Sequence, residues 1–211
     1  MDGAADDSAE TRRLLERARA GDAGAFAALC ARHRPRLLAF LGHRFEPRLR
    51  ARADPSDVVQ EAQMEAHRRL DDYLARRPMP FRVWLEKVAY ERLRMLRRRH
   101  LGADRRAAGR EAPLPEASSE GLARRLAGRG TSPSRALERA ERAAQLRRAL
   151  EHLPEEDREV LLMRNYEDLP YGEIAALLDI SPAAARQRHG RALARLGRLL
   201  SAAELGGSAD E

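Results

Sequence analysis

A run of helix-breaking residues between His100 and Ser134 is the feature that most constrains how this chain can fold. Few large apolar residues lie in the run, and it contains Gly102, Gly109, Pro113, Pro115, Ser118, Ser119, Gly121, Gly128, Gly130 and Pro133. Such a composition favours a flexible linker, with room for one short helix near residues 122–126. The chain is therefore predicted to consist of a block at residues 11–100, a linker at 101–134 and a second block at 135–201.

Both blocks are predicted to be helical, because they are rich in Ala, Leu, Arg and Glu and their apolar residues recur at helical spacing. Inward faces are expected at Leu14 and Leu15, at Phe26, Leu29 and Cys30, at Val58, Ala62, Ala66, Leu70 and Tyr73, at Phe81, Trp84, Leu85, Val88 and Leu93, and at Leu146, Leu150 and Leu153. The expected fold class is all-α, with two small helical domains joined by a flexible linker.

The strongest helix start lies in the first block. Asp54 is expected as the N-cap, with Pro55 at the first helical position and Asp57 three residues after the cap. This helix is expected to reach Tyr73. A loop at residues 74–80 should follow, and after it a helix that becomes strongly basic towards its end.

The second block carries the spacing of a helix-turn-helix. Its first helix should bury Ile174, Ala175 and Leu178, and Ile180 should fill the turn. The helix that begins at Pro182 is expected to place inward Ala185, Leu193 and Leu196, and outward Arg186, Gln187, Arg191 and Arg195. Arginine and glutamine read guanine and adenine edges in the major groove. A helical hairpin with a solvated charged face is the alternative.

The charge of the chain favours an anionic partner, nucleic acid first. The formal net charge is +7 and the sequence pI is near 10.5. The near-exclusive use of arginine suits phosphate contacts, but a GC-rich genome explains it equally well. The single cysteine, Cys30, excludes an intramolecular disulfide and a multi-cysteine zinc site, and we expect it in the core. The acidic N-terminus is not a signal peptide and no segment is expected to cross a membrane, so we expect a cytoplasmic protein.

Several stretches, taken together, resemble the extracytoplasmic-function sigma factors of bacteria. In the second block, Leu153-Pro-Glu-Glu-Asp-Arg-Glu-Val-Leu-Leu-Met-Arg164, Glu173-Ile-Ala175 and the helix at 182–196 are similar to domain four, which reads the minus-thirty-five promoter element. In the first block, Asp57-Val-Val-Gln-Glu61, Tyr73 and Phe81-Arg-Val-Trp-Leu85 are similar to domain two, which binds polymerase and the minus-ten element. The second-block motif is shared with many regulators, whereas the pair in this order is highly specific.

The resemblance implies roles for individual residues. It implies that core RNA polymerase is bound by Asp57, Gln60 and Glu61. It implies that the minus-ten DNA is met by Tyr73, Arg76, Arg77, Phe81, Trp84, Arg92, Arg97 and Arg98. It implies that the minus-thirty-five DNA is read by Arg186, Gln187, Arg188 and Arg191. Aromatic planes suit unstacked bases, and arginines near them suit phosphates.

The sequence departs from the family pattern at several positions. Glu91 and Met95 stand where the family commonly has Asn and Asp, so the minus-ten preference should be unusual. Pro170 replaces a common capping Ser, and His189 replaces a common aliphatic core residue. Gly190 leaves one base-facing position without a side chain, so the recognition helix should make fewer contacts than usual.

The resemblance implies core RNA polymerase and promoter DNA as partners, with no cofactor, no metal and no catalysis. It leaves open whether an anti-sigma factor binds the chain. A stand-alone helix-turn-helix regulator is the main alternative, but it leaves the Asp57–Glu61 motif unexplained. An enzyme would need a site built from Asp54, Asp57 and Glu61, and the sequence offers no further ligand to complete it.

Overall fold

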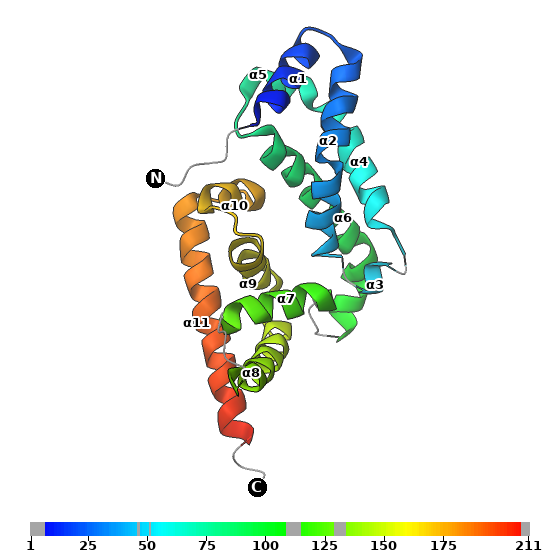
Figure 1. Ribbon diagram of the computed structural model, residues 1–211. Coiled ribbons are helices and arrows are strands. Elements are labelled where there is room, and N and C mark those ends of the chain that lie inside the picture. Colours follow the sequence, from blue (N-terminus) through cyan, green and yellow to red (C-terminus); the bar gives the residue numbers. More distant parts are fainter. Residues whose placement is uncertain (1–6, 46, 51, 109–114, 129–133, 208–211) are drawn as a thin grey trace. The chain divides into compact units, whose positions relative to one another are not determined.

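The computed structural model describes residues 7–45, 47–50, 52–108, 115–128 and 134–207, and within these every element is a helix (Figure 1). This confirms the all-α class. The chain divides into two compact units, residues 1–108 with 176–179 and residues 109–175 with 180–211. Each is described by itself, and α10 is described with the second unit, which holds most of it. Within the described part of the chain, a helix with the length and apolarity needed to cross a bilayer does not occur.

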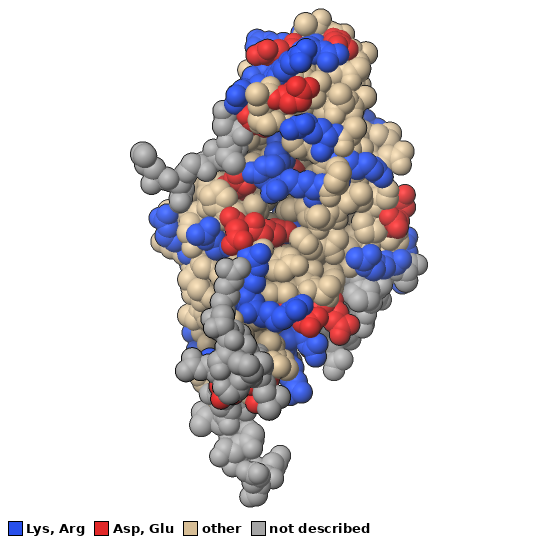
Figure 2. Space-filling model, in the orientation of Figure 1, with Lys and Arg blue, Asp and Glu red and all other residues tan. Residues whose placement is uncertain are grey.

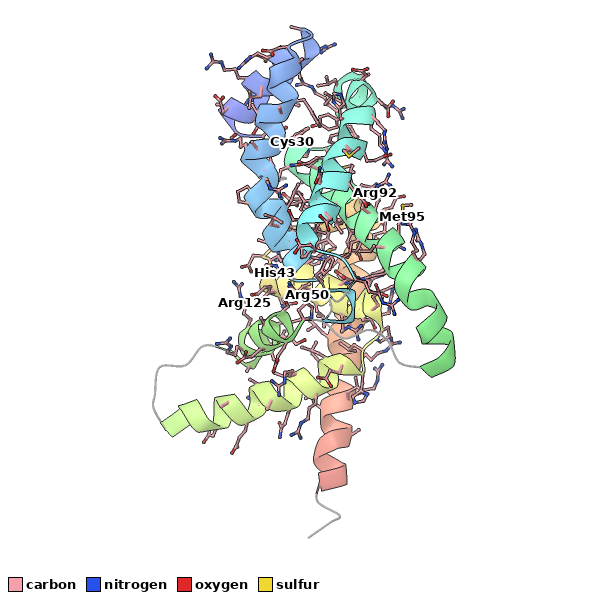
Figure 3. The ribbon with its side chains drawn as sticks, turned by 90° about the vertical axis from the view of Figure 1, so that its right-hand side faces the viewer. Cys30, His43, Arg50, Arg92, Met95 and Arg125 are labelled. Carbon is pink, nitrogen blue, oxygen red and sulfur yellow. The ribbon has the colours of Figure 1, made fainter. Side chains whose placement is uncertain are left out.

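The first unit is built around three packed helices. Helix α4 packs on both α2 and α6, and α1 packs on α2 (Figure 1). The helices of this unit are α1 (Ala9–Arg19), α2 (Ala23–Gly42), α3 (Pro47–Arg50), α4 (Pro55–Arg68), α5 (Leu70–Arg76) and α6 (Phe81–Ala108). The apolar faces expected from the sequence supply most of the core, including Leu15, Leu29, Val58, Ala62, Leu85, Val88 and Leu93. Cys30 is a free, buried thiol in this core, and burial raises its pKa to about 11 (Figure 3).

Two boundaries in the first unit differ from those expected. Asp54 caps α4 as expected, because its Oδ1 accepts a hydrogen bond of 2.7 Å from the backbone N–H of Ser56. The helix does not reach Tyr73, however. It ends at Arg68, and Tyr73 belongs to the short helix α5. The loop that follows shortens to residues 77–80, with Arg77 in the left-handed region at φ 38°.

The second unit begins inside the segment expected to be linker. Its helices are α7 (Glu116–Ala127), α8 (Ser134–Glu151), α9 (Glu155–Leu161), the π-helix η1 (Leu162–Tyr166), α10 (Tyr171–Leu178) and α11 (Pro182–Gly207). Helix α7 packs on α8 and η1, and it buries Leu122 and Ala123. The packing is close, because a Cβ added at Gly121 would lie 2.5 Å from Cε2 of Tyr166. Residues 116–127 are thus a packed helix of the second unit, longer than the short helix expected near residues 122–126.

The helix-turn-helix forms as expected at α10 and α11. Ile174 and Ala175 are buried, and Asp179 takes the left-handed conformation that the turn needs. Ser181 caps α11 by accepting the backbone N–H of Ala184 at 3.1 Å. The inward face of α11 consists of Ala185, Ala192 and Leu196. Leu193 was wrongly expected inward: it is 38% exposed, because it lies one position round the helix from Ala192.

Candidate functional site

The acidic and amide face of α4 is exposed. Asp57, Gln60 and Glu61 are one turn apart and all three are exposed, while Val58 and Val59 on the opposite side are buried. Among the residues that the structure describes, neither Asp57 nor Glu61 has an ion-pair partner. This face is therefore available to a partner that carries positive charge.

One turn further along α4, the carboxylate of Glu65 already binds arginine side chains of the same unit. Glu65 accepts hydrogen bonds from Arg69 at 2.7 Å and Arg68 at 3.0 Å, and it forms an ion pair with Arg92 of α6 at 2.8 Å. The hydrogen bond from Arg69, followed by the other arginines, holds the pKa of Glu65 below its usual value. Arg92 was expected to meet DNA, and in this structure its guanidinium is held by Glu65.

The aromatic residues that the resemblance assigns to the minus-ten DNA form a packed cluster, in line with the inward faces expected from their helical spacing. Tyr73, Phe81 and Trp84 are at most 8% exposed. The rings of Tyr73 and Trp84 stack with centroids 4.4 Å apart, and Phe81 lies 5.6 Å from Tyr73 and 5.5 Å from Trp84. The hydroxyl of Tyr73 donates to the carbonyl of Met79 at 3.0 Å, and burial raises the pKa of this phenol. In this conformation no ring face is open to a base.

The cluster supports the loop before α6. Arg76 and Arg77 at the end of α5 are exposed, and Arg76 forms an ion pair with Asp72. Asp7 closes the N-terminus of α6, because its carboxylate accepts the backbone N–H of Phe81 at 2.9 Å. The sequence alone gave no reason to connect Asp7 with this helix.

The basic end of α6 mixes buried and exposed arginines. Arg98 and Arg94 are exposed, and exposure of Arg98 is what a phosphate contact would need. Met95, labelled on α6 in Figure 3, is also exposed. Arg97 differs from them, because it is only 4% exposed and its Nη2 donates at 2.6 Å to the carbonyl of Arg44. In this conformation Arg97 joins α6 to the segment after α2.

Helix α11 presents three of its four expected DNA-reading residues. Arg186, Gln187 and Arg191 are exposed. Arg188 is half-buried and lies 3.4 Å from Glu156 in the first turn of α9. On the same flank, Arg195 binds Asp157 at 2.7 Å. These two ion pairs fix α11 to α9, so Arg188 supports the helix in this structure.

The other flank of α11 is fixed through His189, which the sequence marked only as a departure. Its Nδ1 lies 3.0 Å from the hydroxyl of Tyr171, and its Nε2 lies 2.9 Å from Oδ1 of Asn165. Burial, followed by the positive charge of Arg164, lowers the pKa of His189, so the ring is neutral at pH 7. Polar contacts thus replace the aliphatic packing that the family pattern suggests.

Comparisons with known proteins find a family match in each of the two units. Two family models match the chain, Sigma-70 region 2 at residues 29–101 and Sigma-70 region 4 at residues 143–196. The ECF RNA polymerase sigma-E factor of Escherichia coli K12 is 30% identical over 182 residues, which are 85% of this chain and 88% of that protein. This chain belongs to the extracytoplasmic-function (ECF) sigma factors.

Two further relatives span nearly the whole sigma factor. The RNA polymerase sigma-H factor of Pseudomonas aeruginosa is 29% identical over 196 residues, which are 90% of this chain and 94% of that protein. The solved structure of CnrH in complex with the cytosolic domain of CnrY is 28% identical, with a TM-score of 0.54, and the match covers 92% of this chain and 98% of that one. The chain accordingly acts in promoter recognition and transcription initiation, together with core RNA polymerase and promoter DNA. Sigma factors are initiation factors and not themselves catalysts.

Charged side chains of both signs occur together on the face of the sigma factor that Figure 2 draws. Figure 2 shows lysine and arginine side chains interspersed with aspartate and glutamate over the face that it draws.

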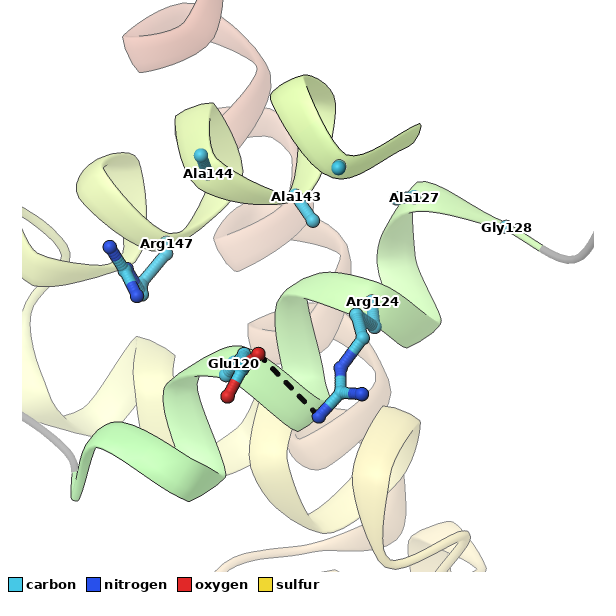
Figure 4. Close-up of a pocket in the computed structure, with 8 residues that line it drawn as sticks. Glu120, Arg124, Ala127, Gly128, Ala143, Ala144 and Arg147 are labelled. Carbon is cyan, nitrogen blue, oxygen red and sulfur yellow. Dashed lines mark ion pairs between the residues drawn. The ribbon is translucent and has the colours of Figure 1, made fainter. Parts of the chain in front are cut away.

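In the described part of the chain, no three His, Cys, Asp or Glu side chains gather as metal ligands would. A pocket of about 390 Å³ lies between α7 and α8, and Figure 4 shows Glu120, Arg124 and Arg147 beside small residues that line it. Neither family model covers α7.

Proposed function

We propose that the first unit binds core RNA polymerase through the α4 face of Asp57, Gln60 and Glu61. The observation that carries the proposal is the contrast along one helix. The carboxylates of Asp57 and Glu61 are exposed and lack ion-pair partners among the described residues, whereas Glu65 is held by arginines. A basic surface on the polymerase could form ion pairs with Asp57 and Glu61 without breaking an existing ion pair.

We further propose that the second unit reads the minus-thirty-five element with Arg186, Gln187 and Arg191. These exposed side chains lie near the N-terminal end of α11, the part of a recognition helix that contacts base edges. The ion pairs of Arg188 and Arg195 with α9 support the helix from one flank. Arg188 is proposed to contribute to recognition only by holding the helix in place.

For the minus-ten element we propose a division of roles. Arg76, Arg77, Arg92 and Arg98 are proposed to meet phosphates, since each retains some exposure. Tyr73, Phe81 and Trp84 are proposed to act from inside, by holding the loop at residues 77–80 and the start of α6 in place. A base could stack on these rings only after the cluster opens, which would require the polymerase complex to stabilise the opened form.

We also propose that an anti-sigma partner restrains the protein. The support is the similarity to CnrH, which was solved in complex with the cytosolic domain of CnrY. The chain itself is proposed to have no catalytic activity. We place its action in the cytoplasm, where a sigma factor meets polymerase and DNA.

The proposal for α4 is tested by reversing its charge. The double variant Asp57→Arg with Glu61→Arg should lose co-elution with core polymerase in gel filtration and lose run-off transcription, while its circular dichroism stays close to that of the parent. A matched control, Glu10→Arg with Glu16→Arg, makes the same change of charge at exposed positions of α1 and should still co-elute. Co-elution of the folded α4 variant would contradict the assignment. If the parent and the control both fail to co-elute with core polymerase, the result would favour a stand-alone regulator.

A further inference from the structure

We infer that Tyr171 is a positioning residue for promoter reading: its ring holds the Arg186 side chain in place, and its hydroxyl ties that ring to His189. The inference rests on the proposed role of Arg186 at the minus-thirty-five element. Tyr171 is the first residue of α10, so it belongs to the helix that precedes the recognition helix. It would act on DNA through Arg186.

The contact between the two side chains carries the argument. The guanidinium carbon of Arg186 lies 5.1 Å from the centroid of the Tyr171 ring, within the range of a cation–π interaction. Arg186 is exposed, and a long exposed side chain that must order itself on binding loses conformational freedom. A ring that restricts Arg186 beforehand reduces this loss and favours one direction of approach to a base.

The ring itself is held from several elements. The hydroxyl of Tyr171 lies 3.0 Å from Nδ1 of His189, and the other ring nitrogen of His189 lies 2.9 Å from Oδ1 of Asn165 in η1. Because this amide oxygen can only accept, Nε2 carries the proton and Nδ1 accepts from the tyrosine hydroxyl. Arg164 also lies over the same ring at 5.0 Å, and its Nη1 donates to the carbonyl of Leu169 at 3.1 Å.

This network joins the recognition helix to the rest of its unit. Asn165 is also contacted from α7, because Nη1 of Arg125 lies 3.4 Å from its carbonyl and 2.5 Å from Oδ2 of Asp168. The apolar core of the helix-turn-helix is separate, since Ala185, Ala192 and Leu196 are buried without help from the tyrosine hydroxyl. A purely structural role for Tyr171 would weaken binding equally at every base pair, whereas positioning of Arg186 predicts a loss at one.

The test is a double-mutant cycle on the holoenzyme. Promoter binding is measured on a set of templates in which each base pair of the minus-thirty-five element is changed in turn. Arg186→Ala should lose discrimination at one base pair by about tenfold. Tyr171→Leu should lose roughly two- to fivefold at the same base pair and little elsewhere. In the Arg186→Ala background, Tyr171→Leu should cause no further loss of discrimination.

A second series keeps the shape of the ring. Tyr171→Phe should retain discrimination to within about twofold, because the ring face remains. Trifluorinated phenylalanine at position 171 should lose discrimination as the leucine variant does, since fluorine removes electron density from the ring face. This series gives an answer even where Tyr171→Leu does not fold, as judged by circular dichroism.

The possible outcomes distinguish the positioning role of Tyr171 from the proposed promoter reading by α11. A Tyr171 effect that is uniform over all base pairs, or that persists undiminished in the Arg186→Ala background, would overturn the inference. So would an Arg186→Ala variant without a base-specific loss while Gln187→Ala and Arg191→Ala show one. If none of the three α11 variants loses discrimination at any base pair, the proposed reading by α11 fails, and the inference fails with it.

Discussion

The two units treat their expected DNA-binding residues in opposite ways. In the second unit, Arg186, Gln187 and Arg191 stand exposed on α11 before any DNA is present. In the first unit, Tyr73, Phe81 and Trp84 are buried and packed against one another, and Arg97 is buried against Arg44.

This difference corresponds to the two forms of DNA that the units are proposed to meet. Base edges of a closed duplex are accessible in the major groove, so a rigid helix with exposed side chains can read them directly. Bases of the minus-ten element become accessible only after unstacking, which costs a few kcal/mol per base. Exposed aromatic rings would also be a liability in the free protein, because apolar patches promote association. Burial of the rings in the free protein avoids that liability.

The largest expected effect is on the aromatic cluster. Trp84→Ala should lower the free energy of unfolding by about 3–5 kcal/mol, because it removes a large buried ring stacked on Tyr73. Gln187→Ala in the second unit should change it by less than about 0.5 kcal/mol. Urea unfolding followed by circular dichroism measures both. A Trp84→Ala protein of parental stability would show that the ring is not part of the core, and the contrast between the units would disappear.

A smaller effect on stability is expected at Arg97 of α6, and none at its neighbour Arg98. Arg97→Ala should cost about 1–3 kcal/mol of stability, because it leaves the buried carbonyl of Arg44 without its donor. Arg98→Ala should leave stability unchanged to within about 0.5 kcal/mol and reduce the salt dependence of promoter binding by about one phosphate contact. Unfolding curves and holoenzyme affinities over a range of salt concentrations test the pair. If the Arg97→Ala protein were fully stable and its promoter binding depended less on salt, Arg97 would be a phosphate contact and not a structural residue.

The smallest expected effect is a pH dependence in the first unit. His33 lies 5.5 Å from Phe81, and burial, followed by the charge of Arg32, lowers its pKa below the usual 6.5. The unfolded chain therefore binds a proton more readily than the folded unit, so stability should fall as the pH drops below about 6.5. Trp84 is the only tryptophan, so its fluorescence during urea unfolding reports on this unit.

The control for this dependence is His33→Gln, which removes the titrating group. The variant should flatten the change of stability between about pH 6.5 and 5, a range above the ordinary titration of carboxylates. An unchanged slope in this variant would show that His33 is not the source of the pH dependence.

The helical class, the two blocks and the helix-turn-helix could all be predicted from the residues alone. These follow from local signals: apolar residues at helical spacing, the Asp54-Pro55 start of α4, and the Ser181-Pro182 start of α11. The exposed faces of α4 and α11 also follow, because a residue opposite a buried stripe faces outward.

The accessibility of the expected DNA-binding residues could not be predicted in this way, because it depends on contacts that form when the chain folds. A window of sequence cannot show that Arg97 meets the carbonyl of Arg44, that Asp7 closes α6, or that α7 packs on η1 through Gly121. Each contact joins residues distant in the chain, and burial depends on such contacts more than on the residue type. The same holds for His189, which is a departure in the sequence and becomes, through Tyr171 and Asn165, a fixed point of the recognition helix.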